Sequence, residues 1–212
     1  MNARELVSDA WRDLVRRHGH GVPSAESTLE ELVRAYAEPH RHYHTLDHVA
    51  DLLRLWEKHG GASDAGAVRL AILFHDAVYD PMRRDNEAAS AKLAVRQLSA
   101  LGFPQQLLGK IETYILATRH GAAPQAMEDA DLDMLLDLDL SVLAAASDRY
   151  RIYALAIRQE YSAVPDALYR PGRRRVLEGF LARPQIYRTE RLRALWEAPA
   201  RANLSAEIAT LM

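Results

Sequence analysis

The chain has no cysteine among its 212 residues. Disulfides, thiolate metal ligands and a cysteine nucleophile are therefore excluded together, and nothing in the sequence points to an oxidising compartment. Any protein ligand to a metal ion must come from a histidine or a carboxylate. The chain has nine histidines and 29 acidic residues, so both ligand types are present.

Two further features are missing, a strong net charge and a long apolar run. The formal net charge is −2 and the pI is near 6.5, which gives no overall field that attracts nucleic acid or an anionic membrane. No apolar run approaches the roughly 18 residues of a membrane span, and the charged N-terminus lacks a signal-peptide core. We therefore expect a cytoplasmic protein with no membrane partner and no clear nucleic-acid partner.

Apolar residues recur at spacings of three and four, which predicts helices with one buried face. We expect these helices at 5–15, 29–36, 45–59, 67–79, 85–101, 104–119, 148–162, 166–182 and 189–210. Strand-like alternation, internal repeats and long linkers are not found. The sequence therefore predicts an all-α, single-domain helical bundle over residues 1–212, with roughly eight to ten helices.

Three segments concentrate possible metal ligands: 41–48, 74–76 and 137–139. His75 and Asp76 lie within the apolar string AILFHDAVY, where burial of the pair is costly unless hydrogen bonds or a cation compensate. A mixed set of imidazole and carboxylate ligands suits Mn, Fe, Zn or Mg. His44 and His48 share a helix face if the helix has already begun at His44, so that one can bind metal while the other donates a proton.

These segments carry a resemblance to a known family. The string YHTLDHVADLL, from Tyr43 to Leu53, is similar to the first motif of the cyclic-nucleotide phosphodiesterases. With His75-Asp76 and the later Asp-Leu-Ser, it resembles the HD superfamily of metal-dependent phosphohydrolases. Over residues 39–204, the strings PHRHYHTLDHV, FHDAVYDPMRRDNEAASA, LLDLDLSVL and EAPARANL are similar to a family of bacterial predicted HD-type phosphohydrolases.

The resemblance implies an HD-type helical fold that holds one or two divalent ions through His48, His75, Asp76 and Asp139. It makes Asp76 suited to bridge a second ion and to take part in catalysis. His44 falls where the phosphodiesterases keep their general acid. Asp137, two positions before Asp139, is the alternative last ligand.

The chain departs from several HD branches, which place a further histidine just after the His-Asp pair. Here Asn86 and Glu87 stand in its place, so a full two-metal site needs another ligand. Glu87, His120 and Asp137 are the candidates for a second ion or for a supporting role. Arg83 and Arg84 follow the His-Asp pair closely enough to contact a substrate phosphate, although such a loop pair is more often solvent-facing.

The expected function is hydrolysis of a phosphate ester or phosphoanhydride, with a nucleotide or related small molecule as substrate. A non-catalytic metal- or nucleotide-binding module and an HD-type di-iron oxygenase are the alternatives, the latter needing a fuller histidine set. The C-terminal helices can cover the core or form a homodimer. Two charged segments are interpreted as solvated: most of the acidic run 128–139, with Asp129, Asp131 and Asp133, and the basic run 173–175.

Overall fold

The structure, a computed structural model, describes residues 1–19, 22–60, 65–119 and 129–211. Over these ranges the chain forms ten α-helices, α1–α10, and one 3-10 helix, η1, without a strand, which confirms the all-α prediction. No described helix is both long and apolar enough to cross a membrane. The chain divides into two compact units, residues 1–119 and 120–212. The single-domain and HD-type assignments stay predictions.

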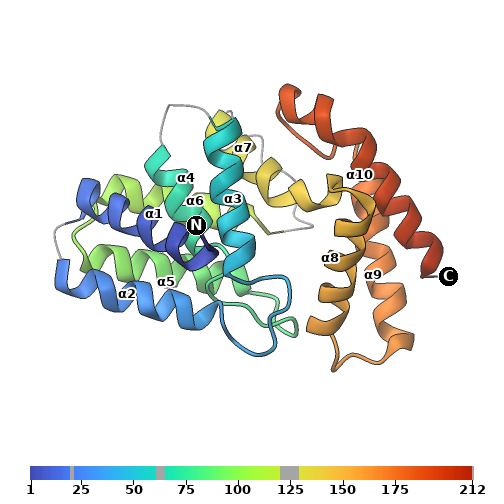
Figure 1. Cartoon of the computed structure of the whole chain (residues 1–212), viewed down its shortest axis with the longest axis horizontal. Helices are drawn as coiled ribbons and strands as arrows, with labels where there is room; N and C mark the ends of the chain where they lie inside the picture. The colour runs from blue at the N-terminus through green and yellow to red at the C-terminus, as the bar shows by residue number, and fades with distance from the viewer. Residues whose placement is uncertain (20–21, 61–64, 120–128, 212) are drawn as a thin grey trace. The chain divides into compact units, whose positions relative to one another are not determined.

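The first unit is built around a buried central helix. Its six helices are α1 Ala3–His18, α2 Val22–Ala35, α3 Leu46–His59, α4 Ala65–Phe74, α5 Asn86–Ala100 and α6 Gln105–Ala117 (Figure 1). Helix α4 packs against α1, α3, α5 and α6. From Ala67 to Phe74 every side chain of α4 except Arg69 is buried, as its nearly continuous apolar sequence predicts.

Local sequence signals fix several helix ends of this unit. Asn2 and Glu5 form a reciprocal capping box at the start of α1. Helix α3 begins at Leu46, one residue after the start of the predicted range 45–59, and the side chain of the N-cap residue Thr45 makes no capping hydrogen bond. Helix α5 is followed by Gly102, whose φ of 78° lies in the left-handed region that favours glycine.

The helix predicted over 67–79 is shorter in the structure, because α4 ends at Phe74. Side chains from α5 replace the helical hydrogen bonds in the turn that follows. Ser90 accepts a hydrogen bond from the Val78 amide at 3.0 Å and donates one to the Val78 carbonyl at 3.2 Å. Asn86 bonds the amide and the carbonyl of Asp80 in the same way, at 3.1 and 2.8 Å. These contacts hold the chain in a turn directly after the His-Asp pair.

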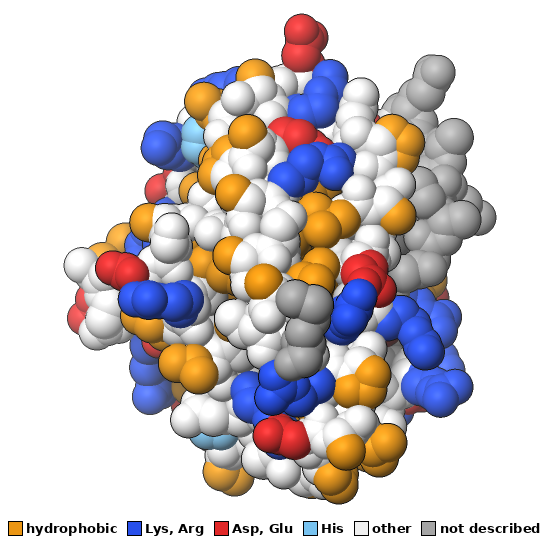
Figure 2. Space-filling model, turned by 90° about the vertical axis from the view of Figure 1, so that its right-hand side faces the viewer, with side chains coloured by type: hydrophobic (Ala, Val, Ile, Leu, Met, Phe, Trp, Pro, Cys, Tyr) orange, Lys and Arg blue, Asp and Glu red, His pale blue; other side chains and the backbone are white. Residues whose placement is uncertain are grey.

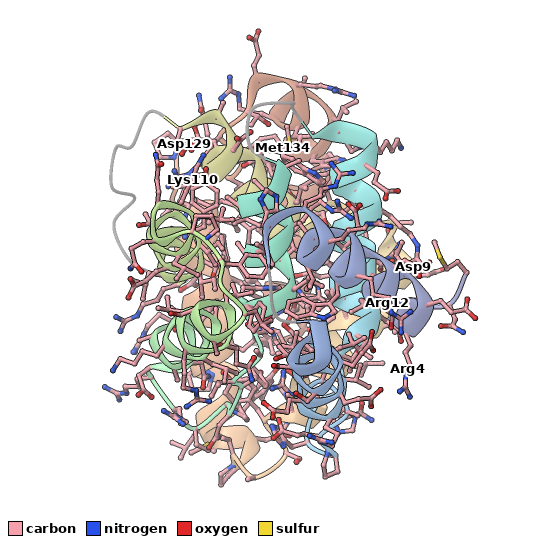
Figure 3. All side chains as sticks on the ribbon, turned by 90° about the vertical axis from the view of Figure 1, so that its left-hand side faces the viewer. Arg4, Asp9, Arg12, Lys110, Asp129 and Met134 are labelled. Atoms are coloured by element: carbon pink, nitrogen blue, oxygen red, sulfur yellow. The ribbon has the colours of Figure 1, made fainter. Side chains whose placement is uncertain are left out.

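Helix α1 is joined to its neighbours by polar contacts at both exposed and buried positions. The Trp11 indole donates to the Ala25 carbonyl at 2.9 Å, linking α1 to α2. Figure 3 shows Arg4, Asp9 and Arg12 pointing outward from α1, where the two arginines pair with Glu30 and Glu26 of α2. Exposed pairs of this kind contribute little to stability.

A more protected ion pair joins α1 to α4. Asp13 accepts a hydrogen bond from Arg69 at 2.9 Å, and each side chain is 20% exposed. Arg69, together with Arg17 and Arg16, lowers the pKa of Asp13 to about 2. Because the folded-state pKa lies below the unfolded value, the contribution to stability is present above pH ~4 and is lost as the pH falls towards 2.

Asp13→Asn is therefore expected to lower the free energy of unfolding by roughly 1–2 kcal/mol at pH 6. The difference from the wild-type chain should shrink as the pH falls from 4 to 2, since the wild-type carboxylate becomes protonated there. Urea unfolding at several pH values measures this. The exposed Asp9 on the same helix provides the matched control, Asp9→Asn, and a difference for Asp13→Asn that does not depend on pH would contradict the prediction.

The second unit contains α7 Ala130–Asp139, η1 Leu140–Ala144, α8 Ser147–Glu160, α9 Asp166–Leu181 and α10 Glu190–Thr210. Helix α10 packs against α8, α9 and η1. Its apolar core includes Leu143, Leu177 and Leu204, all at most 2% exposed. Tyr187 and Leu192 are fully buried and Trp196 packs against the core, so these side chains cover the core of the second unit. A homodimer stays a prediction.

The interpretation of Arg173 as a surface residue is wrong. Its guanidinium pairs with Glu207 at 2.7 Å, and the two side chains are only 8% and 9% exposed. Glu207 also accepts a hydrogen bond from the Tyr150 hydroxyl at 2.6 Å. Burial, followed by the charge of Glu207, raises the pKa of Tyr150. The sequence does not distinguish Arg173 from the neighbouring Arg174 and Arg175, which are exposed as expected of a charged helix face.

The acidic run is also less solvated than predicted. Asp129 occupies the N-cap of α7 and accepts hydrogen bonds from the amides of Asp131 and Leu132. Asp131 itself is 4% exposed, which corrects its interpretation as a solvated residue. Asp133 pairs with Arg188 at 2.8 Å. On the face of the molecule in Figure 2, basic, acidic and apolar side chains are interspersed, as the small net charge leads one to expect.

Candidate metal centre

Three donor atoms of the first unit meet at the end of α4. His75 Nε2 lies 3.0 Å from Asp76 Oδ2 and 3.3 Å from His48 Nε2, while His48 Nε2 and Asp76 Oδ2 are 3.9 Å apart. Ligands about 2.1 Å from an ion are about 3.0 Å apart at a right angle and about 3.4 Å apart at a tetrahedral angle. Two of the three separations match these values, so the donor set fits a divalent ion.

The secondary structure explains how these three residues meet. His48 lies in the first turn of α3, where it is 6% exposed, and α3 packs against α4. His75 and Asp76 follow the last residue of α4. The C-terminal end of a helix carries partial negative charge and favours a cation. The dipole of α4 and the Asp76 carboxylate therefore act in the same direction, while the N-terminal end of α3, near His48, acts in the opposite one.

The hydrogen bond at His75 Nδ1 determines which ring nitrogen carries the proton. His75 Nδ1 lies 2.9 Å from the carbonyl oxygen of Ile72, and only a protonated Nδ1 can donate to it. In a neutral ring of this tautomer the lone pair is on Nε2. Metal-binding histidines commonly have this arrangement, because a carbonyl partner fixes both the tautomer and the ring orientation.

His44 lies beside the three donors, but it does not share a helix face with His48. Helix α3 begins at Leu46, so His44 precedes the helix instead of sharing one of its faces. Its ring is nevertheless 6.1 Å from that of His48, measured between centroids. The His44 ring also stacks on Tyr79 at 4.1 Å and 29°. His44 is thus a half-buried imidazole next to the candidate ligands.

The remaining candidates of the first unit do not join the group of three donors. Glu87 is half-buried in the first turn of α5 and is not among the donors that the described residues bring together. Arg83 forms a double hydrogen bond with Asp85, at 2.9 and 3.0 Å, so its guanidinium is engaged at the surface. Arg84 is exposed. His120 lies outside the described residues.

Asp137 and Asp139 belong to α7 in the second unit, and both are buried. Asp137 accepts hydrogen bonds from the amides of Arg188 and Thr189, at 2.7 and 2.8 Å, and from the Thr189 hydroxyl at 2.6 Å. Burial raises the pKa of Asp137, against the three hydrogen bonds, which lower it. These bonds give Asp137 a structural role at the start of α10, while Asp139 stays the predicted last ligand.

Several residues around the donors have roles that the sequence did not indicate. Tyr79 covers one side of His44, and Ser90 and Asn86 hold the turn that follows Asp76. Arg41 has a completely buried side chain and donates to the Asp76 carbonyl at 2.7 Å. Periodicity does not mark such residues, because they contact main-chain atoms or rings of other segments and do not belong to a repeating apolar face. Their only sequence signal is proximity to the histidines.

We compared the chain with models of protein families, with curated proteins and with solved structures, and none of the three comparisons found a match. The case for a function therefore depends on the residues themselves and on their geometry.

Proposed function

We propose that the protein is a metal-dependent phosphohydrolase of the HD type that acts on a phosphate ester or phosphoanhydride, with a nucleotide or related small molecule as the substrate class. The observation that carries this proposal is the group formed by His48 Nε2, His75 Nε2 and Asp76 Oδ2. The resemblance of the three sequence segments to HD proteins supports it independently of the geometry.

In this proposal His48, His75 and Asp76 hold the ion, and Asp139 is the further ligand expected from the resemblance. A divalent ion there would supply Lewis acidity, which lowers the pKa of a water molecule and polarises the phosphoryl oxygens. His75 contributes a fixed lone pair at Nε2, because its Nδ1 proton is bonded to Ile72. His44, next to the donors, gives a proton to the leaving oxygen, and no covalent intermediate is required.

We propose that the site holds one ion strongly. The described ligands form a single group of three, and Asn86, which stands where a further histidine would serve a second ion, is bonded through both amide atoms to the main chain of Asp80. A di-iron oxygenase needs a fuller ligand set, so this arrangement favours hydrolysis.

Metal analysis of the purified protein, followed by phosphate release from a panel of nucleotides with Mn²⁺, Mg²⁺, Fe²⁺ or Zn²⁺ added in turn, tests the proposal directly. Stoichiometric metal and metal-dependent release are expected. Bound iron without phosphate release would favour the oxygenase, and bound metal without turnover of any kind would favour a binding module.

If His44 protonates the leaving oxygen, its removal should affect leaving groups to different extents. His44→Ala should retain the metal but lower kcat by about 10²–10⁴-fold for alkyl phosphate esters, whose leaving oxygen needs a proton. For p-nitrophenyl esters of the same phosphate the loss should be less than about tenfold, since nitrophenolate leaves without protonation. Steady-state kinetics across a series of leaving groups measures this difference.

His42, exposed and two residues away, provides the control for this experiment. His42→Ala is expected to leave both the metal content and the leaving-group series unchanged. An equal loss for alkyl and nitrophenyl esters in His44→Ala would show that His44 is not the proton donor.

A further inference from the structure

We propose that Arg41 is a positioning residue, which fixes the segment carrying His44 against the turn carrying His75 and Asp76. This inference depends on the function proposed above, because it concerns the same site. Arg41 lies in the short connection between α2 and α3, where its amide donates to the Glu38 carbonyl at 3.0 Å. Its side chain is 0% exposed, so a guanidinium charge is held inside the first unit.

The guanidinium bonds to both segments of the site at once. Nη1 donates to the main-chain carbonyl of His44 at 3.2 Å and to that of Asp76 at 2.7 Å. Nη2 donates to the carbonyl of Ala77 at 3.2 Å. The bonded carbonyls of His44 and Asp76 are 32 residues apart in sequence, and one side chain joins them.

All three of these hydrogen bonds are accepted by main-chain carbonyl oxygens and none by a side chain that is a candidate metal ligand. Arg41 bonds to the main-chain carbonyl of Asp76, while the Asp76 carboxylate lies 3.0 Å from His75 Nε2. Arg41 can therefore fix the position of Asp76 without competing with a metal ion for its carboxylate. An arginine bonded to the carboxylate itself would oppose metal binding through its charge.

Aromatic rings hold the guanidinium in place. Its central carbon lies 5.1 Å from the ring centre of Tyr36 and 5.4 Å from that of Tyr79. The Tyr36 hydroxyl donates to the Leu73 carbonyl in the last turn of α4. Tyr79 in turn stacks on the His44 ring, so the contact series runs from Arg41 through Tyr79 to His44.

Only arginine supplies this geometry. Its planar group carries five N–H donors in fixed directions and stacks on aromatic rings, whereas lysine presents one compact ammonium. Nε also donates to Glu38 at 2.9 Å, which gives the buried charge a carboxylate partner. A lysine at this position keeps the charge but cannot bond Glu38, His44 and Asp76 together.

The test is Arg41→Lys, with Arg54→Lys as the matched control, because Arg54 is exposed on α3 and pairs with Asp51 on the same helix. We expect Arg41→Lys to fold, to shift the side-chain ¹⁵N signals of His44 and His75 in the metal-free protein at a fixed pH, and to weaken Mn²⁺ binding about tenfold. Its kcat should fall more than its KM rises. Arg54→Lys should show none of these changes.

The histidine signals and Mn²⁺ binding require no turnover, so they separate this inference from the proposed function. Shifted signals and weaker Mn²⁺ binding without phosphate release in either chain would support Arg41 while contradicting the hydrolase. A folded Arg41→Lys with unchanged histidine signals and unchanged Mn²⁺ affinity would overturn the inference.

If Arg41→Lys does not fold, the wild-type chain labelled with ¹⁵N-arginine decides the question. The Nη protons of Arg41 are expected as separate, slowly exchanging signals, because hydrogen bonds and two rings prevent rotation. Saturation with Zn²⁺ should shift them. A single averaged Nη signal that Zn²⁺ does not move would overturn the inference.

Discussion

Asp76→Asn is expected to weaken divalent-metal binding at least about 100-fold and to reduce phosphate release to about 1% or less. Asparagine keeps the shape of the side chain but removes the negative charge from an atom 3.0 Å from His75 Nε2. The two histidines that remain are neutral ligands, which attract a divalent ion much less than a carboxylate does. The loss should therefore be electrostatic, without a change in the fold.

Calorimetric titration with Mn²⁺ and thermal unfolding with and without the ion measure this effect. A bound ion stabilises the folded chain, so the Tm of the wild-type protein should rise with Mn²⁺, while the Tm of Asp76→Asn should not. In the absence of metal Asp76→Asn should still fold, because the bond from Arg41 to Asp76 uses the main-chain carbonyl.

The matched control is Asp47→Asn. Asp47 is an exposed carboxylate in the first turn of α3, directly before His48 in sequence. Its replacement should leave Mn²⁺ binding unchanged and cost at most about 1 kcal/mol through the helix dipole. Wild-type affinity in Asp76→Asn, or an equal loss in Asp47→Asn, would remove the basis for the proposed metal site.

Asp137→Asn is expected to lose stability and Asp139→Asn to lose metal. The Asp137 carboxylate accepts three hydrogen bonds from Arg188 and Thr189, and it is 1% exposed. An amide nitrogen in place of Oδ2 would face two donors and leave them unsatisfied. We therefore expect Asp137→Asn to lose roughly 2–4 kcal/mol of unfolding free energy and to retain the metal. Asp139→Asn is expected to lose the metal, as its place in the Asp-Leu-Ser segment predicts.

Urea unfolding of the metal-free chains and metal content after reconstitution distinguish the two variants. Asp133→Asn is a suitable comparison on the same helix, because its partner Arg188 is shared but the pair is about a third exposed. Metal loss in Asp137→Asn with full metal in Asp139→Asn would reverse the assignment. Full metal in both would confine the ligands to the first unit.

Much of the helical fold could be predicted, since amphipathic periodicity needs only the sequence and one buried face. The structure confirms the nine expected helices as α1–α6 and α8–α10 and adds α7 in the acidic run. The largest differences are at the start of α2, expected near Leu29 and found at Val22, and at the end of α4. Its apolar pattern continues past Phe74, but Ser90 and Asn86 supply hydrogen bonds that a helix there would have to displace.

The candidate site was predictable in its residue types but not in its geometry. The burial of His75, and the position of Asp76 beside it, follow from the apolar string around them. The approach of His48 depends on the packing of α3 against α4. Asp137 and Asp139 look alike in the sequence, and only the start of α10 gives Asp137 its hydrogen-bond partners.

The sequence by itself determined the all-α class, the positions of most helices and the histidine and aspartate residues available for a metal, because these depend on local pattern and side-chain chemistry. Tertiary structure decided which donor atoms come within 3.0–3.9 Å of one another, where the His-Asp turn begins, and that Arg41 and Arg173 are buried. A buried charge needs partners, and most of those of Arg41 and Arg173 come from segments far away in sequence, which local sequence does not identify.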